Sequence, residues 1–158
     1  LGQHVLHPTA VPASTKKLAR NSWEAVELDD PAKDDFAYTN ELLDLLIEDY
    51  CVDETRVYAT GMSGGGLFTS QLVCEMSDRL AGAASIAAIS YPESCDPARA
   101  VPFIAIHGTE DRTVDVKHSD TFVEALEKAG AKDVTYHRVD GAGHFSFDPG
   151  HRFYPLFL

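Results

Sequence analysis

Apolar residues recur at helical spacing along residues 34–50, the first strongly patterned segment of the chain. The positions that share one face are Phe36, Leu42, Leu43, Leu46 and Ile47. Asp34 and Asp35 stand at the start, where carboxylates are favoured by the helix dipole. The pattern therefore predicts a helix over 34–50.

Shorter apolar runs, bounded by Gly- and Asp-containing loops, follow this helix and indicate strands. The predicted strands cover 56–60, 80–89, 101–106 and 134–139, with a further candidate at His4–His7. The alternation within 134–139 is typical of an edge strand, and helices are predicted at 64–77 and 119–129. Strands that alternate with helices predict one α/β domain over 1–158, with a mostly parallel sheet and helices on both faces.

Composition narrows the function classes. The chain has 158 residues and a formal net charge of -12, which disfavours nucleic-acid binding. No apolar run is long enough to span a bilayer, and no signal-peptide pattern stands at the start. We therefore expect neither nucleic-acid nor membrane partners. Because the chain begins at Leu1 rather than Met, we expect a processed product or a fragment.

The three cysteines, Cys51, Cys74 and Cys95, fit no zinc-site spacing, so no metal site is predicted. Cys51 and Cys74 lie in apolar contexts typical of a core, whereas Cys95 lies in a polar loop. In an oxidising compartment one pair can form a disulfide, which leaves one cysteine over.

Candidate chemistry begins at Gly61-Met62-Ser63-Gly64-Gly65, between a predicted strand and a predicted helix. A G-x-S-x-G at such a junction is typical of the nucleophile elbow of serine hydrolases. We expect a strained backbone at Ser63 and glycines on both sides, because a Cβ there would collide with the neighbouring elements. The backbone N–H of Gly64 is the expected oxyanion donor.

A serine nucleophile needs a histidine base and a carboxylate that orients the histidine. Asp111 and His144 follow Ser63 in the chain order of α/β-hydrolases, and each follows a predicted strand. Since functional residues gather at the carboxyl ends of parallel strands, we expect the three to meet there.

Other side chains compete for these roles. The rival acids are Glu110 and Asp115, and the rival bases are His107, His118, His137 and His151. Asp111 is favoured because it comes a few residues after the strand end, and His144 because it lies on a glycine-flanked loop. His107 is interpreted as a structural residue that holds the acid loop. For the substrate pocket the candidates are Trp23, Tyr91 and Phe145; a core role for Trp23 is an equal alternative.

A string of motifs in this order resembles a known group of enzymes. The matching stretches are Asn21–Glu24, Asp34–Phe36, Tyr50–Asp53, Arg56–Ser63, Cys95–Pro97, Val101–Pro102, His107–Asp111 and Gly143–His144. The chain is similar to the secreted α/β-hydrolase esterases, which include feruloyl esterases, acetylxylan esterases and poly(3-hydroxybutyrate) depolymerase-like enzymes. The resemblance implies the same nucleophile, acid and base, secretion, and no metal or organic cofactor.

Two departures from that pattern matter. Position 64, commonly Asn or Gln in the group, is Gly here. Residues 1–12 already resemble the strand after a His-Gly-rich loop that supplies the second oxyanion donor, so N-terminal strands are expected to be missing.

The sequence therefore predicts a serine esterase acting on small or polysaccharide-linked carboxylic esters, with feruloyl esters of plant cell walls as the first expectation. An acetyl(xylan) esterase and a polyester depolymerase are alternatives within the same machinery. A non-catalytic α/β-hydrolase remnant is an alternative from another class.

Overall fold

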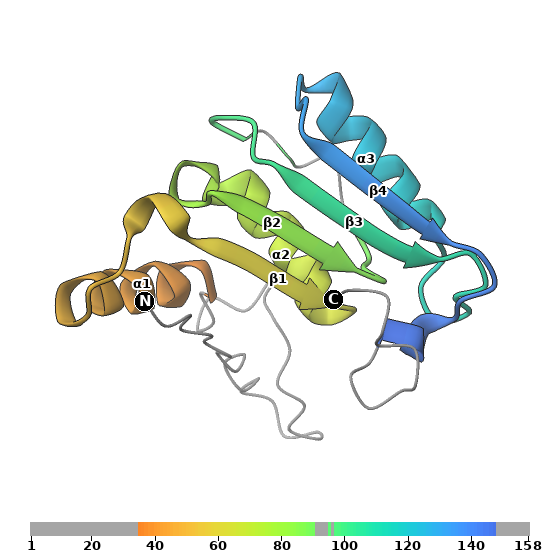
Figure 1. The fold of residues 1–158 in the computed structure, drawn as a ribbon, viewed down its shortest axis with the longest axis horizontal. Coiled ribbons are helices and arrows are strands. Elements are labelled where there is room, and N and C mark those ends of the chain that lie inside the picture. The colour runs from red at the N-terminus through yellow and green to blue at the C-terminus, as the bar shows by residue number, and fades with distance from the viewer. Residues whose placement is uncertain (1–34, 91–94, 96, 148–158) are drawn as a thin grey trace.

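The computed structural model describes residues 35–90, 95 and 97–147 (Figure 1). Its centre is a four-stranded sheet in the order β1-β2-β3-β4. The strands are β1 Tyr58–Met62, β2 Gly82–Ile86, β3 Phe103–Gly108 and β4 Val134–Val139. Every neighbouring pair is parallel, so all strands end at the same edge of the sheet. The predicted parallel sheet is confirmed, and β4 is the edge strand that its alternation predicted.

Two helices, α2 Gly64–Glu75 and α3 Lys117–Lys128, cover one face of this sheet. Their apolar side chains share one core with the strand residues that point toward them. Its members on α2, β3 and α3 include Leu67, Phe68, Leu72, Val73, Phe103, Phe122, Val123 and Leu126. The ring of Phe103 on β3 meets that of Phe122 on α3 edge to face, with centroids 5.4 Å apart. This core fixes α2, and with it the elbow at its N-terminus, against β1 and β2.

A third helix, α1 Asp35–Asp49, packs beside α2. The ring centroids of Phe36 and Phe68 are 5.3 Å apart. Near the edge of the sheet where the strands begin, the guanidinium of Arg79 donates to Asn40 at 2.8 Å and to Asp44 at 2.6 Å. Arg79 belongs to the short 3₁₀ helix η3 Ser77–Arg79, which lies between α2 and β2 in the chain.

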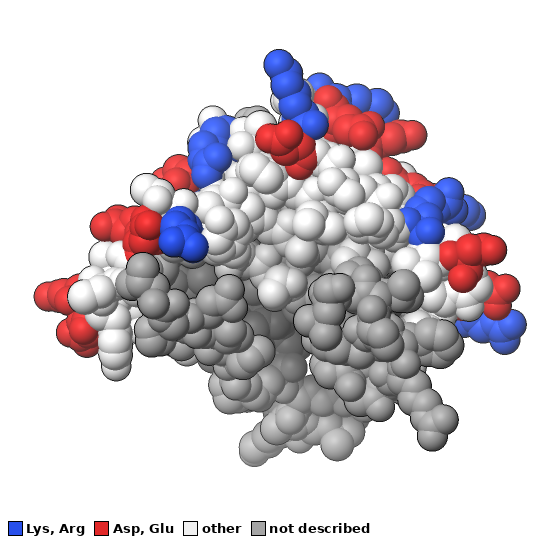
Figure 2. Space-filling model, viewed as in Figure 1, with Lys and Arg blue, Asp and Glu red and all other residues white. Residues whose placement is uncertain are grey.

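The face of the sheet that points away from α2 and α3 is low in charge. In Figure 2 the Lys, Arg, Asp and Glu side chains lie around the rim, and the centre over the strands is white. Two large apolar side chains of this face, Tyr58 and Ile104, are exposed. The sequence predicts helices on both faces of the sheet. Within the described residues, helices are seen on one face.

Strand 134–139 matches its expected bounds, and the other elements shift at their ends. Strand β1 begins later than expected because residues 54–56 form the 3₁₀ helix η2 Glu54–Arg56. Asp53 caps it: the N–H and the hydroxyl of Thr55 both donate to Asp53 Oδ1. The strand candidate at His4–His7 lies outside the described residues.

Two of the three cysteines form a disulfide. Cys74 on α2 forms a disulfide with Cys95 in the loop after β2. Cys51 is a free, exposed thiol, so the interpretation of Cys51 as a core residue was wrong. Of the apolar residues near it, Ile47 and Val52 are partly buried and Tyr50 is exposed.

Candidate active site

Ser63 lies on the sharp turn between β1 and α2. Its backbone has φ 55° and ψ -119°, a conformation that a non-glycine residue adopts only at a cost. The Ser63 N–H donates to the carbonyl of Ile86 on β2 at 2.9 Å, which holds the turn in place. The strain that the sequence predicted at this serine is confirmed.

The glycines around Ser63 differ in whether the structure leaves space for a Cβ. A Cβ at Gly61 would collide with the backbone carbonyl of Gly65, and one at Gly66 would lie 2.7 Å from the Cβ of Ala88. A Cβ at Gly65 meets nothing within 4 Å. The expectation that both glycines of the G-x-S-x-G must be small for steric reasons was therefore right for Gly61 and wrong for Gly65. The close approach at the helix side falls on Gly66.

The structure brings Ser63, His144 and Asp111 into one hydrogen-bonded chain. His144 Nε2 is 3.0 Å from Ser63 Oγ, and His144 Nδ1 is 2.7 Å from Asp111 Oδ2. An ionised carboxylate only accepts hydrogen bonds, so Nδ1 carries the proton and donates to Asp111. Nε2 of the neutral ring is then the acceptor for the Ser63 hydroxyl. This is the tautomer that a general base acting on Ser63 requires.

Asp111 is fixed from two sides. Its Oδ1 accepts the backbone N–H of Thr113 at 2.8 Å and that of Val114 at 2.9 Å. The side chain has no exposed surface. Burial alone raises the pKa of Asp111, but the hydrogen bonds from Val114, His144 and Thr113 outweigh it and hold the pKa below its ordinary value. Asp111 is thus a carboxylate at neutral pH and is able to orient His144 through Nδ1.

The loops that carry Asp111 and His144 are joined through their backbones. The N–H of Thr109 donates to the carbonyl of Val139, and the N–H of Glu110 donates to that of Ala142, both at 3.0 Å. A Cβ at Gly108 would collide with the Ala142 carbonyl, so the approach depends on glycine at the end of β3. The register of β3 and β4 thus sets the distance between acid and base.

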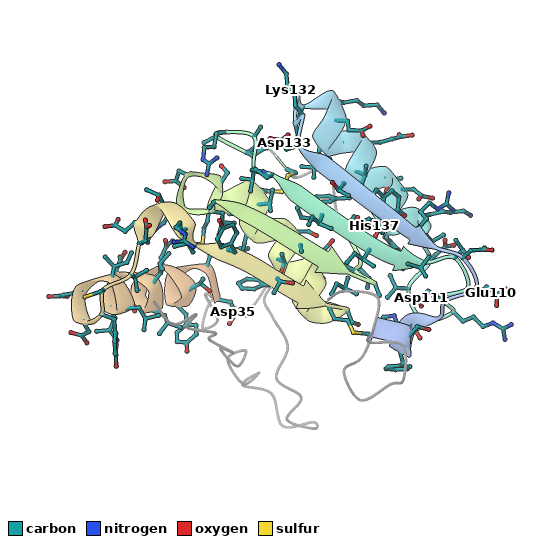
Figure 3. The ribbon with its side chains drawn as sticks, viewed as in Figure 1. Asp35, Glu110, Asp111, Lys132, Asp133 and His137 are labelled. Atoms are coloured by element: carbon teal, nitrogen blue, oxygen red, sulfur yellow. A yellow bond between two sulfur atoms is a disulfide. The ribbon has the colours of Figure 1, made fainter. Side chains whose placement is uncertain are left out.

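Among the described residues, none of the rival acids and bases is hydrogen-bonded to Ser63, which pairs with His144. Glu110 is exposed, and the Asp115 carboxylate accepts the N–H of Lys117 at the start of α3. Figure 3 shows Asp111 beside the 3₁₀ helix η5 His144–Phe147, whereas His137 lies along β4. His137 is exposed, His118 is the second residue of α3, and His151 lies outside the described residues. His107 is fully buried and does not contact Ser63.

Of the three candidates for the substrate pocket, one lies within the described residues. Trp23 and Tyr91 lie outside the described residues. Phe145 is 57% exposed, and its ring meets that of His144 edge to face with centroids 5.2 Å apart. Its apolar surface is therefore exposed beside His144. Gly64, the first residue of α2, faces open space at its Cβ position.

Within the ranges that the structure describes, no group of three or more His, Cys, Asp or Glu side chains is placed to hold a metal ion. Among those same residues, no helix has the length and apolar character to cross a membrane.

Two contacts near the site were not predicted from the sequence. The Thr109 hydroxyl bonds Asp140, and the Ser119 hydroxyl bonds His107. A signal for Ser119 existed: it shares the apolar face of α3 with Phe122, Val123 and Leu126. A serine on such a face needs a buried partner. No comparable pattern marks Thr109.

Comparisons with known proteins agree with this geometry. Two curated relatives are feruloyl esterase B of Piromyces equi, 34% identical over 86 residues, and a bifunctional acetylxylan esterase/xylanase of Neocallimastix patriciarum, 26% identical over 90 residues. The alignments cover 51% and 57% of this chain. The chain spans only 16% and 13% of the length of these two proteins.

A solved thermostable esterase is similar over 77% of this chain and 33% of its own, with 26% identity and a TM-score of 0.67. The family model of the phospholipases and carboxylesterases matches residues 17–150. That range includes Ser63, Asp111 and His144, and it covers most of the chain. The chain therefore belongs to the phospholipase/carboxylesterase family of α/β-hydrolases.

Proposed function

We propose that this chain carries the catalytic site of a serine carboxylesterase, with Ser63 as nucleophile, His144 as general base and Asp111 as the acid that orients it. The observation that carries the proposal is the continuous chain from Ser63 Oγ to His144, 3.0 Å, and on to Asp111, 2.7 Å. The strained turn at Ser63 and the family membership support the same reading.

In the proposed reaction, Ser63 Oγ attacks the ester carbonyl carbon and its proton passes to His144 Nε2. The N–H of Gly64, at the positive end of α2, faces the resulting oxyanion, and the first N–H groups of a helix have no partner within the helix. The leaving alcohol takes the proton from His144, which leaves an acyl group on Ser63. Water, deprotonated by the same histidine, then releases the acid.

We propose hydroxycinnamoyl (feruloyl) esters, free or linked to plant polysaccharide, as the substrate class. The relative named feruloyl esterase supports this, as does the exposed ring of Phe145 beside the reacting atoms. An aromatic acyl group packs favourably against such a ring, by about 0.5–1.5 kcal/mol. Acetyl esters are the second candidate, because the other curated relative is named an acetylxylan esterase.

The Cys74–Cys95 disulfide supports an extracellular site of action, which we propose with the substrate. Disulfides persist in oxidising compartments and are rare in the cytosol. A polysaccharide ester is also a substrate that is met outside the cell.

Hydrolysis of methyl ferulate and of p-nitrophenyl acetate tests the proposal, with Ser63→Ala as the inactive control. We expect both esters to be cleaved by the native chain and neither by the variant above background. Cleavage of acetate alone would overturn the feruloyl assignment and leave the esterase. Equal, slow release by both proteins would overturn the esterase and favour the non-catalytic remnant.

Phe145→Ala tests the acyl pocket. Loss of one aromatic contact predicts a rise in KM for methyl ferulate of about five-fold, with little change for the acetate. Tyr58→Ala is the matched control, since Tyr58 is also an exposed aromatic and lies at the start of β1, at the far end of that strand from Ser63. Equal effects of Phe145→Ala on both esters would exclude an aromatic acyl site at this ring.

A further inference from the structure

A second histidine lies against the proposed catalytic acid. His107, on β3, has no exposed surface, and its Nε2 is 3.3 Å from Asp111 Oδ2. The same nitrogen is 3.0 Å from the carbonyl oxygen of Val114. On the other side of the ring, Nδ1 is 2.7 Å from Ser119 Oγ on α3. One imidazole therefore links the strand, the acid loop and the helix.

The partners of His107 determine where its protons lie. The Val114 carbonyl only accepts, so Nε2–H is the donor. A hydroxyl both donates and accepts, so Ser119 is free to match the state of Nδ1. With the ring proton on Nε2, Nδ1 accepts from the Ser119 hydroxyl. Ser119 thus satisfies the one ring atom that would otherwise be buried without a partner.

The acid loop closes around this ring. Val114 donates its N–H to Asp111 Oδ1 at 2.9 Å and accepts from His107 through its carbonyl. A fixed His107 therefore fixes Val114, and Val114 helps to fix the carboxylate whose other oxygen lies 2.7 Å from His144. A ring released from Ser119 would be able to turn away from Val114 and Asp111. Asp111 is the ionisable group that the described contacts place against His107, and His144 lies behind it.

We propose that Ser119 is a positioning residue for the esterase reaction, which acts through His107 to hold Asp111 in place for His144. Ser119 is 4% exposed and its hydroxyl is bonded to His107, so its effect on the reaction is indirect. This inference rests on the proposed function. It adds α3 to the elements that determine the geometry of the site.

The test compares Ser119→Thr with Ser119→Val in the full chain. Both variants add the same bulk at a buried position, and only Thr keeps the hydroxyl. Ser119→Ala is measured beside them as a variant without added bulk. Activity is measured at a temperature where every protein keeps the native circular dichroism, so that loss of the fold does not enter the comparison.

We expect kcat for p-nitrophenyl acetate to fall about 10- to 100-fold in Ser119→Val and Ser119→Ala, with KM within about two-fold, because small misplacement of a catalytic group costs rate at this scale. Ser119→Thr should keep most of the native kcat. The downfield proton resonance of His144 Nδ1–H should shift in Val and Ala and stay in Thr.

The outcomes separate the two proposals. If the native chain is no faster than Ser63→Ala, the proposed esterase function fails. If the native chain is active and Ser119→Ala keeps kcat while its melting temperature drops, Ser119 is only a packing residue and the positioning proposal is overturned. Equal losses in Thr and Val would also overturn it, because the hydroxyl would then be irrelevant.

Discussion

The hydroxyl of Thr109 donates to Asp140 Oδ1 at 3.2 Å and accepts the N–H of Gly141 at 3.0 Å. Thr109 lies on the loop that carries Asp111, and Asp140 lies on the loop that carries His144. This side chain therefore joins the acid loop to the base loop at the surface, beyond the backbone bonds that already connect them.

Thr109→Val removes this hydroxyl and keeps the shape of the side chain. One exposed hydrogen bond contributes about 0.5–1.5 kcal/mol, so we expect only a small loss of stability. Because the loops set the distance between Asp111 and His144, kcat should fall about three- to ten-fold. Thr55→Val is the control: it breaks a similar Thr–Asp pair at the far edge of the sheet and should leave kcat unchanged. Equal kcat in Thr109→Val and Thr55→Val would show that the hydrogen bond between Thr109 and Asp140 has no role in the site.

The glycines of the elbow give a second prediction. Gly65→Ala should be tolerated, because its Cβ enters open space and alanine favours the first turn of α2; the free energy of unfolding should rise by about 0.4–1 kcal/mol. Gly61→Ala should reduce both stability and soluble yield, because its Cβ collides with backbone. Urea denaturation of the two variants measures the difference. A destabilised Gly65→Ala would contradict the steric account.

The pattern of apolar residues predicted which helices and strands form. The exact ends of these elements depend on polar contacts, which the hydrophobic periodicity does not encode. The edge strand 134–139 was predicted with its observed bounds, whereas β1 was misplaced because the Asp53 cap extends the turn before it. Chain order and the strand ends were enough to choose Ser63, Asp111 and His144. Gly66 was missed because close packing of two backbones depends on distance in space, and the motif itself does not include that residue.

The lowered pKa of Asp111 predicts a pH-dependent difference in stability between the native chain and Asp111→Asn. The group is ionised more readily in the folded than in the unfolded chain, so its contribution is fully present above its ordinary pKa of 3.8 and is lost as pH falls through the lower folded value. The free-energy difference between the two proteins should be constant above about pH 5 and shrink below pH 4. Urea denaturation between pH 3 and 6 measures it, and a difference independent of pH would contradict the assignment.

The disulfide gives a prediction that does not involve catalysis. Cys74 and Cys95 are 21 residues apart, and closing a loop of this size stabilises a fold by about 3 kcal/mol. Dithiothreitol should lower the melting temperature of the native chain and have no effect on Cys74→Ala/Cys95→Ala. Cys51→Ala should melt like the native chain in both conditions, since Cys51 is unpaired and exposed. A native chain insensitive to the reductant would argue against the bridge.

Covalent labelling tests whether Ser63 is the nucleophile. The full chain is incubated with a fluorophosphonate, digested, and mapped by mass spectrometry. We expect one adduct per chain, on the peptide that contains Ser63, with labelling abolished in Ser63→Ala and slowed by orders of magnitude in His144→Ala. An unlabelled Ser63 in the folded native chain, or equal labelling of the Ser63→Ala variant, would contradict it.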